Sequence, residues 1–456
     1  MDNKFLDKSA YIRIPASEVK IGMFVVELDR PWLGTPFLTQ GFVISSNSEI
    51  KKLRELCIFI YEEKAGRLWA GKQDPFSKEN VHANAFDSGK PQTGIFNQAQ
   101  QRKPSLVATI NDRQPHLITH SFFEELPRAQ KLYLTSRRAM TDLLGQARQE
   151  NRVDMSLAAK LVLGLVRSVL RHPDPLLFLT HTKDASKYLL EHCLHMAIFS
   201  ANFGRVLRLE EKDILRLAIH GLLADFGMIR LPQELLNKQE GLTQSERQLI
   251  NSHPQLGREI LMNSESGARF ATDAVINHHE RLDRKGYPRG IDARTLPQFS
   301  RIISIVDAYD AMTSPRVYAE EKSPLQALQQ IYRNRGKQFD EEYALEFIHS
   351  IGPYPAGTLV ELHNGAVAIV LTSAPKQRQL PLISILLGPD KQPQPPQRLD
   401  LSELDNEGKN CRDLMIQRVL RNGEYGINLM TLPLEALEAP VTAEPETDAE
   451  PDQESI

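Results

Sequence analysis

The spacing of hydrophobic residues divides the chain into strand-like and helical regions. Residues 11–62 contain short apolar runs, such as "IGMFVVEL" and "CIFIYEE", separated by Gly and Pro, which is typical of strands and turns. From about 116 to 350, apolar residues recur at spacings of three and four, which indicates helices. Strand-like runs return between 353 and 432. The pattern predicts a mainly α protein, with a helical bundle flanked by a small N-terminal β-containing domain and a small C-terminal β-rich segment.

Changes in composition set the expected boundaries. A polar stretch rich in Gln, Asn, Ser and Lys follows the first strands, and eight acidic residues without a basic one lie between Glu435 and Glu454. The expected parts are a small β-containing N-terminal domain (1–70), a flexible linker (71–115), a helical connector (116–183), the helical bundle (184–350), a small β-rich domain (351–432) and an acidic disordered tail (433–456).

Several helix ends can be read from the sequence. Gly204 is expected to close one helix of the bundle, and Thr243 with Glu246 forms a capping-box pattern for a later one. The further expected caps are Thr272, Ser323 and Asp340.

Composition adds few surprises. Hydrophobic residues make up 41% and charged residues 25% of the chain, as in soluble globular proteins, and no apolar run approaches the roughly 20 residues of a membrane helix. The three cysteines are scattered, which argues against a disulfide framework and favours the cytoplasm. The net charge of −3 comes with no concentrated basic segment, so DNA is not an expected partner.

Histidines and aspartates concentrate in the helical region. Six of the thirteen histidines fall between 192 and 279, and Asp307 and Asp310 lie one turn apart on a predicted helix. Each piece alone has an ordinary explanation, such as a satisfied core histidine or an ion pair of Asp307 with Arg301. Facing helices of a bundle can nevertheless bring such residues together, so their joint order favours a metal site.

Two of these stretches, "HHERLDRKGYPRG" and "RIISIVDAYDAMTSPRVY", resemble the signature of the HD-GYP subgroup of the HD phosphohydrolase superfamily. "LLADFGMIRLPQELLNK" and "HPQLGREIL" fall at matching places, so the resemblance covers about 184–350. "IRIPASEVKIGMFVVELDRPWLGTPF" resembles a small domain of uncharacterised role that often precedes HD-GYP units in bacteria. The resemblance implies an HD-type metal domain in bacterial cyclic di-GMP signalling, hydrolysing this dinucleotide to its linear form and to GMP.

The resemblance also implies site residues, position by position. Asp225 matches the bridging and catalytic carboxylate of a site for one or two divalent transition metals, Fe or Mn. The other implied ligands are His192, His253, His278, His279 and Asp307. Arg316 matches a position that contacts the nucleotide. The name-giving loop, implied to shape the substrate site or to contact GGDEF-type diguanylate cyclases, consists of Gly286, Tyr287 and Pro288.

Four positions depart from the family pattern. Ala224 stands where the family has the histidine of its HD pair, and Met228 where a lysine would approach the phosphate. Tyr188 replaces a glutamate that some members use for a third metal, and Arg284 replaces a loop glycine. One implied metal therefore keeps only three protein ligands, and the phosphate loses a cation. These departures favour weak or absent hydrolysis.

Two neighbouring side chains could compensate. His220 lies one helical turn before Ala224 on the same face, although an ordinary bundle histidine is the favoured interpretation. Arg230 could supply the charge missing at Met228, but two residues along a loop are a poor geometric basis.

Three hypotheses follow from the sequence. The first is a degenerate HD-GYP protein that recognises cyclic di-GMP with little turnover. The second is a working phosphodiesterase with a reduced set of metal ligands. The third is a scaffold that docks signalling partners through the loop that contains Arg284 and Lys285.

Overall fold

The computed structural model divides the chain into two compact units, residues 1–30 with 40–109 and residues 31–39 with 110–456. Most of the expected linker, nearly all of the acidic tail, and Arg316 lie outside the described residues. The described residues are 11–21, 23–25, 27–28, 42–44, 47–63, 105–107, 109–182, 187–236, 238, 240–264, 266–315, 321–373, 378–406, 411–434 and 437.

The smaller unit is built on short antiparallel strands. Its first sheet has the order β1-β5-β3, and β2 pairs with β4. One helix precedes β5, and the apolar side chains of Val25, Leu28 and Ile60 are buried. The elements are β1 (Tyr11–Pro15), β2 (Phe24–Val25), β3 (Glu27–Leu28), β4 (Phe42–Val43), α1 (Asn47–Leu56) and β5 (Phe59–Glu63).

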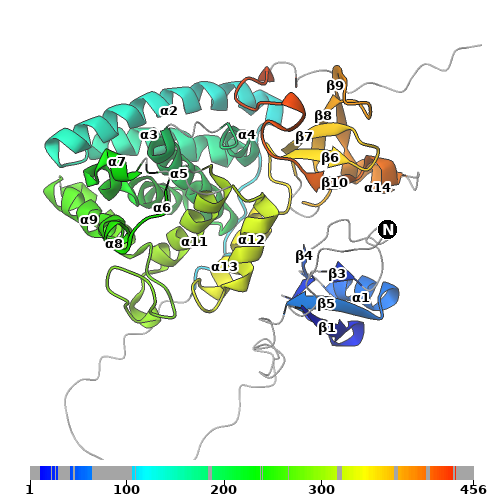
Figure 1. Cartoon of the computed structure of the whole chain (residues 1–456), viewed down its shortest axis with the longest axis horizontal. Helices are drawn as coiled ribbons and strands as arrows, with labels where there is room; N and C mark the ends of the chain where they lie inside the picture. The colour runs from blue at the N-terminus through cyan, green and yellow to red at the C-terminus, as the bar shows by residue number, and fades with distance from the viewer. Residues whose placement is uncertain are drawn as a thin grey trace, which may run out of the picture. The chain divides into compact units, whose positions relative to one another are not determined.

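The larger unit begins with a helical bundle (Figure 1). The long helix α2 packs on α3, α4 and α5, and α5 in turn packs on α6 and α11. Its helices are α2 (Phe122–Glu150), α3 (Met155–Arg171), α4 (Pro173–Leu179), α5 (Tyr188–Val206), α6 (Glu211–Leu223), α7 (Gln233–Leu236), α8 (Gln244–Ile250), α9 (His253–Asn263), α10 (Thr272–Asn277), α11 (Gln298–Thr313), α12 (Pro324–Arg333) and α13 (Glu341–Ile351). No described helix is long and apolar enough to span a bilayer.

Local sequence explains many of the helix ends. Thr243 and Ser323 form capping boxes at α8 and α12, and Asp340 caps α13 through the backbone N–H of Tyr343, so these three predictions are confirmed. The side-chain oxygen of each cap accepts a hydrogen bond from a backbone N–H that the helix itself leaves unpaired.

Two predicted helix ends are wrong. Gly204 lies inside α5 rather than at its end, because α5 uses it to approach Ile214 of α6 closely. Thr272 is the first residue of α10, and its hydroxyl donates to the carbonyl oxygen of Arg269, so it does not cap the helix.

An antiparallel sheet follows the bundle within the same unit. Its strand order is β10-β6-β7-β8-β9, and one face packs around Val360, Val370 and Ile383. Asp174 of α4 accepts hydrogen bonds from the hydroxyl of Thr372 and the backbone N–H of the next residue, which links sheet and bundle. The elements are β6 (Leu359–Leu362), β7 (Val367–Thr372), β8 (Leu382–Leu387), β9 (Pro393–Asp400), α14 (Leu401–Asn406) and β10 (Ile416–Val419).

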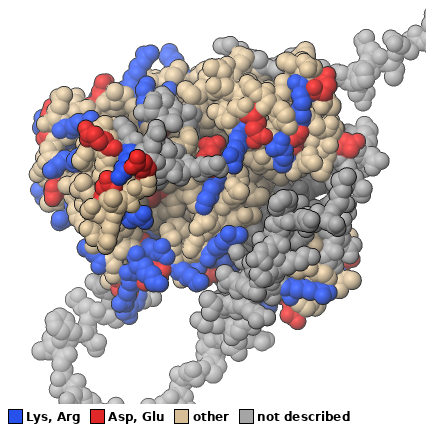
Figure 2. Space-filling model, in the orientation of Figure 1, with Lys and Arg blue, Asp and Glu red and all other residues tan. Residues whose placement is uncertain are grey.

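The predicted fold class is confirmed: a mainly helical chain with a small N-terminal strand region and a C-terminal antiparallel sheet. Acidic and basic side chains are interspersed over the face of the larger unit drawn in Figure 2, rather than separated into fields of one sign.

Candidate metal centre

Asp225 lies where α6 ends and the chain turns into the short 3₁₀ helix η6 (Phe226–Arg230). The apolar residues just before it are fully buried, so this helix end lies in the interior of the bundle. Gly227 lets η6 lie against the first turn of α9, because a Cβ atom there would overlap the carbonyl oxygen of His253. The local sequence thus brings a carboxylate, 6% exposed, beside the histidine that begins α9.

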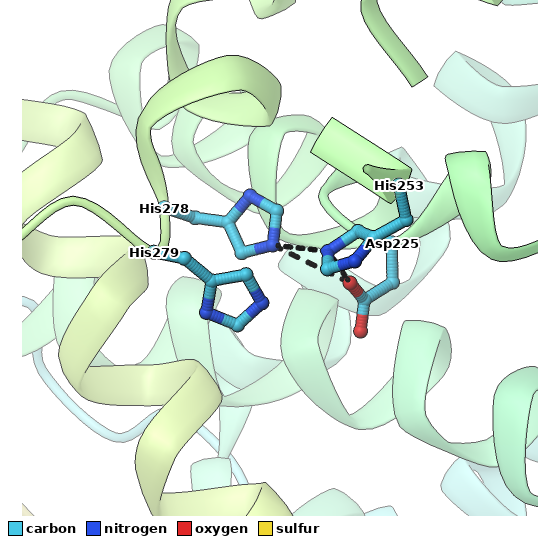
Figure 3. A group of neighbouring side chains, drawn as sticks. All are labelled: Asp225, His253, His278 and His279. Carbon is cyan, nitrogen blue, oxygen red and sulfur yellow. Dashed lines mark hydrogen bonds and ion pairs between the residues drawn. The ribbon is translucent and has the colours of Figure 1, made fainter. Parts of the chain in front are cut away.

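Three histidines gather around this carboxylate (Figure 3). Nε2 of His253 lies 3.0 Å and Nε2 of His278 3.4 Å from Oδ1 of Asp225, and the two nitrogens are 3.1 Å apart. The ring of His279 lies beside that of His278, with centroids 4.1 Å apart. One ligand atom from each of these four residues lies within 4.8 Å of the others. We call Asp225, His253, His278 and His279 the four-residue group.

The tautomers in this group are set by backbone hydrogen bonds. Nδ1 of His253 lies 2.8 Å from the carbonyl oxygen of Ile250, and Nδ1 of His278 lies 2.8 Å from that of Val275. Because a carbonyl oxygen only accepts, each Nδ1 carries the proton, and in the neutral rings each Nε2 presents a lone pair to the other and to the carboxylate. Lone pairs that converge in this way repel one another unless a cation lies among them.

A second group shares Asp225. Nε2 of His192, on α5, lies 2.9 Å from Oδ2 of Asp225 and 3.3 Å from Oδ1 of Asp307, on α11. Nδ1 of His192 lies 2.7 Å from Oδ2 of Asp310, which directs Nε2 toward the other two carboxylates. We call His192, Asp225 and Asp307 the three-residue group, and its ligand atoms also lie within 4.8 Å of one another.

Both groups fit divalent metal ions. Nε2 of His192 and Oδ1 of Asp225 are buried and have no hydrogen-bond partner within the described part of the chain, despite their close neighbours. The donors are imidazole nitrogens and carboxylate oxygens without sulfur, a set that suits Mn, Fe or Zn. Atoms so placed are satisfied by an ion that all of them face.

Electrostatics point the same way. Burial raises the pKa of Asp225, but His253 and His192 lower it more, so the pKa lies well below its ordinary value. Burial lowers the pKa of His192 and of His278, yet Tyr188 and the carboxylates around His192, and Asp225 beside His278, raise both above the ordinary value. The cluster therefore attracts positive charge, which a proton or a metal ion can supply.

The position that departs from the HD pair contributes no ligand. Ala224 is fully buried, and its methyl group has no donor atom, so the three-residue group lacks the imidazole that a histidine there would offer. Tyr188 stacks on His192, with centroids 5.5 Å apart and planes 11° apart. Met228 is only partly buried and brings no charge.

Neither compensating side chain reaches the site. Nε2 of His220 lies 3.1 Å from the carbonyl oxygen of Phe270, and its ring packs on Phe270 and Phe299. Arg230 donates to the side chain of Asn151 at 3.0 Å on the surface. Arg301 pairs with Asp340 rather than with Asp307.

A pocket of about 190 Å³ opens on three of the six implied ligands, His278, His279 and Asp307. Gly286 and Tyr287 line it, and the Tyr287 ring centroid is 4.6 Å from that of His279. Pro288 follows through a cis peptide bond and is not among the lining residues. The other lining residues are Glu280, Arg281, Lys285, Ser304, Ala308, Gln338 and Phe339.

The structure brings all six implied ligands together, and it adds residues that the sequence interpretation did not assign. Asp310 orients His192, His195 contacts the other oxygen of Asp310, and Tyr133 contacts His195. His195 could have been found from its spacing. It lies three residues after His192 on the same helix, and residues three apart share a helix face. Tyr133 lies more than fifty residues from its partners, so no local pattern identifies it.

Comparison with known proteins identifies the two regions. The HD domain family matches residues 174–343, and the domain of unknown function DUF3391 matches residues 11–158. A cyclic di-GMP phosphodiesterase of Pseudomonas aeruginosa is 28% identical over 85% of this chain and 88% of its own length. The cyclic di-GMP phosphodiesterase response regulator RpfG of Xanthomonas campestris is 34% identical over 33% of this chain and 39% of its own.

A 3'3'-cGAMP-specific phosphodiesterase of Vibrio cholerae is 33% identical over 29% of this chain and 31% of its own length. The matched HD region contains all six ligand side chains of the two groups as well as the GYP loop. Residues 174–343, which contain the GYP loop, thus match the HD domain family, and residues 11–158 match DUF3391.

Proposed function

We propose that this chain binds cyclic di-GMP at the pocket beside the two ligand groups and hydrolyses it slowly or not at all. The recognition part rests on the names of the relatives and on the lining of the pocket. The slow hydrolysis rests on one observation: the residue beside Asp225 is the buried Ala224, and the described residues offer the three-residue group no fourth ligand.

The side chains have distinct roles in this proposal. Asp225 belongs to both groups and would help to hold an ion of Mn or Fe in each of them. Bound there, divalent cations would acidify water and neutralise charge on a phosphodiester. With three protein ligands, the three-residue group would hold an ion more weakly than the four-residue group would.

The chain's own cations must then orient the phosphate. Met228 cannot do so, whereas Lys285 and Arg281 line the pocket next to His279 and Asp307. Arg281 is paired with Asp283, which lowers its net charge toward a ligand. Lys285 is therefore the proposed phosphate contact, and Tyr287 the wall against which the nucleotide lies.

The test compares the full-length wild type with Ala224→His/Met228→Lys, both loaded with Mn²⁺ or with Fe²⁺ under anaerobic conditions. Restoring one imidazole and one ammonium is expected to raise cyclic di-GMP turnover by about 10²-fold or more, since single electrostatic groups at such sites contribute about 10²–10³-fold. Turnover is followed by separating the linear dinucleotide and GMP from substrate. The same double variant with Asp225→Asn is the control and should be inactive.

Other outcomes select the alternatives. A wild type that turns over within the ordinary range, about 1–10³ s⁻¹, would contradict the proposal and favour a phosphodiesterase with a reduced ligand set. A wild type that shows no binding of cyclic di-GMP by calorimetry would also contradict it, and would favour a scaffold that docks GGDEF-type cyclases through the exposed Arg284 and Lys285.

A further inference from the structure

A chain of buried polar side chains connects α2 to the three-residue group. The hydroxyl of Tyr133, on α2, lies 2.9 Å from Nε2 of His195, and Nδ1 of His195 lies 3.1 Å from Oδ1 of Asp310. The other oxygen of Asp310 lies 2.7 Å from Nδ1 of His192. The exposed fraction is 2% for Tyr133 and 0% for the other three residues.

Further contacts fix the outer end of this chain. The hydroxyl of Tyr133 donates to Oε2 of Glu191 at 2.8 Å, and the other oxygen of Glu191 pairs with Arg137, one turn after Tyr133 on α2. The rings of Tyr133 and His195 stack, with planes 13° apart. Tyr133 and Arg137, one turn apart on α2, therefore face α5. Their partners there, Glu191 and His195, also lie one turn apart.

Such a network is costly to bury and stabilises a particular geometry only when its members are satisfied. An apolar contact between α2 and α5 could be equally stable, so stability alone does not account for it. Its inner end is the ring nitrogen of a residue in the three-residue group. Asp310 divides its two oxygens between His192 and His195, and the orientation of its carboxylate therefore depends on how His195 is held.

We propose that Tyr133 is a positioning residue for metal binding by the three-residue group, acting through His195 and Asp310 on the Nε2 atom of His192. The proposal rests on the metal centre of the proposed function. Tyr133 lies within the DUF3391 match at residues 11–158 and outside the HD match at 174–343. The segment that matches DUF3391 thus supplies Tyr133, which supports the metal centre in the segment that matches the HD domain family.

The test titrates Mn²⁺ into chelator-treated full-length protein by calorimetry and follows the electron paramagnetic resonance spectrum. The wild type is expected to bind two ions, the weaker one at the three-residue group. Tyr133→Phe removes one oxygen and keeps the ring, and should weaken that step by about 10–100-fold, as is usual for residues that orient metal ligands. The tighter step, at the four-residue group, should change little. At two equivalents of Mn²⁺, the electron paramagnetic resonance signal of two coupled ions should be lost.

The matched control is Tyr354→Phe, which deletes the hydroxyl of another buried tyrosine in the core of the C-terminal sheet and should leave both steps unchanged. His195→Leu and His195→Asn provide a second comparison. Leucine removes the donor to Asp310 and should weaken the same step, whereas asparagine keeps a donor near the position of Nδ1 and should restore part of the affinity.

Three results would overturn the proposal: both steps unchanged in Tyr133→Phe, both steps weakened equally, or a wild type that binds only one ion. If Tyr133→Phe fails to fold, as judged by circular dichroism, equal affinity of the three-residue group for Mn²⁺ in the two His195 variants would overturn it. Cyclic di-GMP binding and turnover are measured separately. Their failure contradicts the proposed function, while the metal titration still decides the role of Tyr133.

Discussion

At the residue scale, the candidate metal centre depends on Asp225, because its two oxygens face different nitrogens. Oδ1 lies near His253 and His278, and Oδ2 lies near His192. A single carboxylate at a helix end thus belongs to both ligand groups. The neighbouring Ala224, equally buried, adds only a methyl group. In the proposed centre, the position that could offer the three-residue group a further ligand is therefore occupied by a side chain without a donor atom.

A histidine outside the centre makes stability depend on pH. Burial lowers the pKa of His220 to about 4, although its hydrogen bond to the carbonyl oxygen of Phe270 opposes this shift. The unfolded residue has a pKa of about 6.5, so between these values the unfolded chain binds more protons. Above pH about 6.5, His220 does not change the free energy of unfolding with pH. As the pH falls from there toward 4, the free energy of unfolding decreases by about 3 kcal/mol.

We expect His220→Gln, which keeps a donor toward Phe270 and cannot titrate, to have a flatter dependence of unfolding free energy on pH between 7 and 4.5. Urea unfolding of metal-free protein measures it. The metal ligands titrate in both proteins, so the difference between the two curves isolates His220. Parallel curves would show that His220 is not held neutral.

At the element scale, the contact between η6 and α9 brings Asp225 to His253. Gly227→Ala places a methyl group against the carbonyl oxygen of His253, and backbone cannot yield as a flexible side chain would. We expect a loss of about 1–3 kcal/mol in unfolding free energy, as for other overpacked sites, together with weaker metal binding.

Chemical denaturation and Mn²⁺ titration measure these two effects. Gly145→Ala in α2 is the matched control, because nothing lies within 4 Å of a Cβ atom there. That substitution should be neutral or stabilising by up to about 1 kcal/mol. Equal behaviour of the two variants would mean that the close approach at Gly227 is unimportant.

Much of the element arrangement could be predicted from the sequence, because it depends on local rules. The caps at Thr243, Ser323 and Asp340 involve residues three positions apart and were predictable. Gly204 was misassigned because a glycine that ends a helix and one that lets two helices approach look alike in sequence. Thr272 was misassigned because its hydroxyl bonds to a carbonyl oxygen of the preceding turn instead.

For the site, the sequence supplied the ligand positions only through resemblance to a family. Spacing alone suggested histidines and aspartates in one bundle, but not which of their atoms face one another. The links from Tyr133 through His195 to Asp310 could not be predicted, because they depend on how α2 packs on α5. Such contacts arise only from tertiary packing.

At the scale of the whole molecule, metal binding should stabilise the larger unit. All six candidate ligand residues belong to that unit, in the segment from α5 to α11, and an ion that binds only the folded state adds stability by mass action. With free Mn²⁺ at about 100 times its dissociation constant, the gain is about 2.7 kcal/mol.

Differential scanning calorimetry of chelator-treated protein with and without Mn²⁺ checks this expectation. Asp225→Asn, which removes the charge of the shared carboxylate, should abolish most of the shift. A shift of the same size in wild type and Asp225→Asn would place the bound metal elsewhere.

The position of α2 also bears on how this architecture can be inherited. The helix falls within the segment matched by one family, yet its Tyr133 completes a hydrogen-bonded network inside the segment matched by the other. If the two segments were separated by recombination, the bundle would lose the partner of His195, and a new neighbour would have to provide one. A cut before α2 would therefore keep the network intact, whereas a cut at the start of the HD match would remove Tyr133 from it.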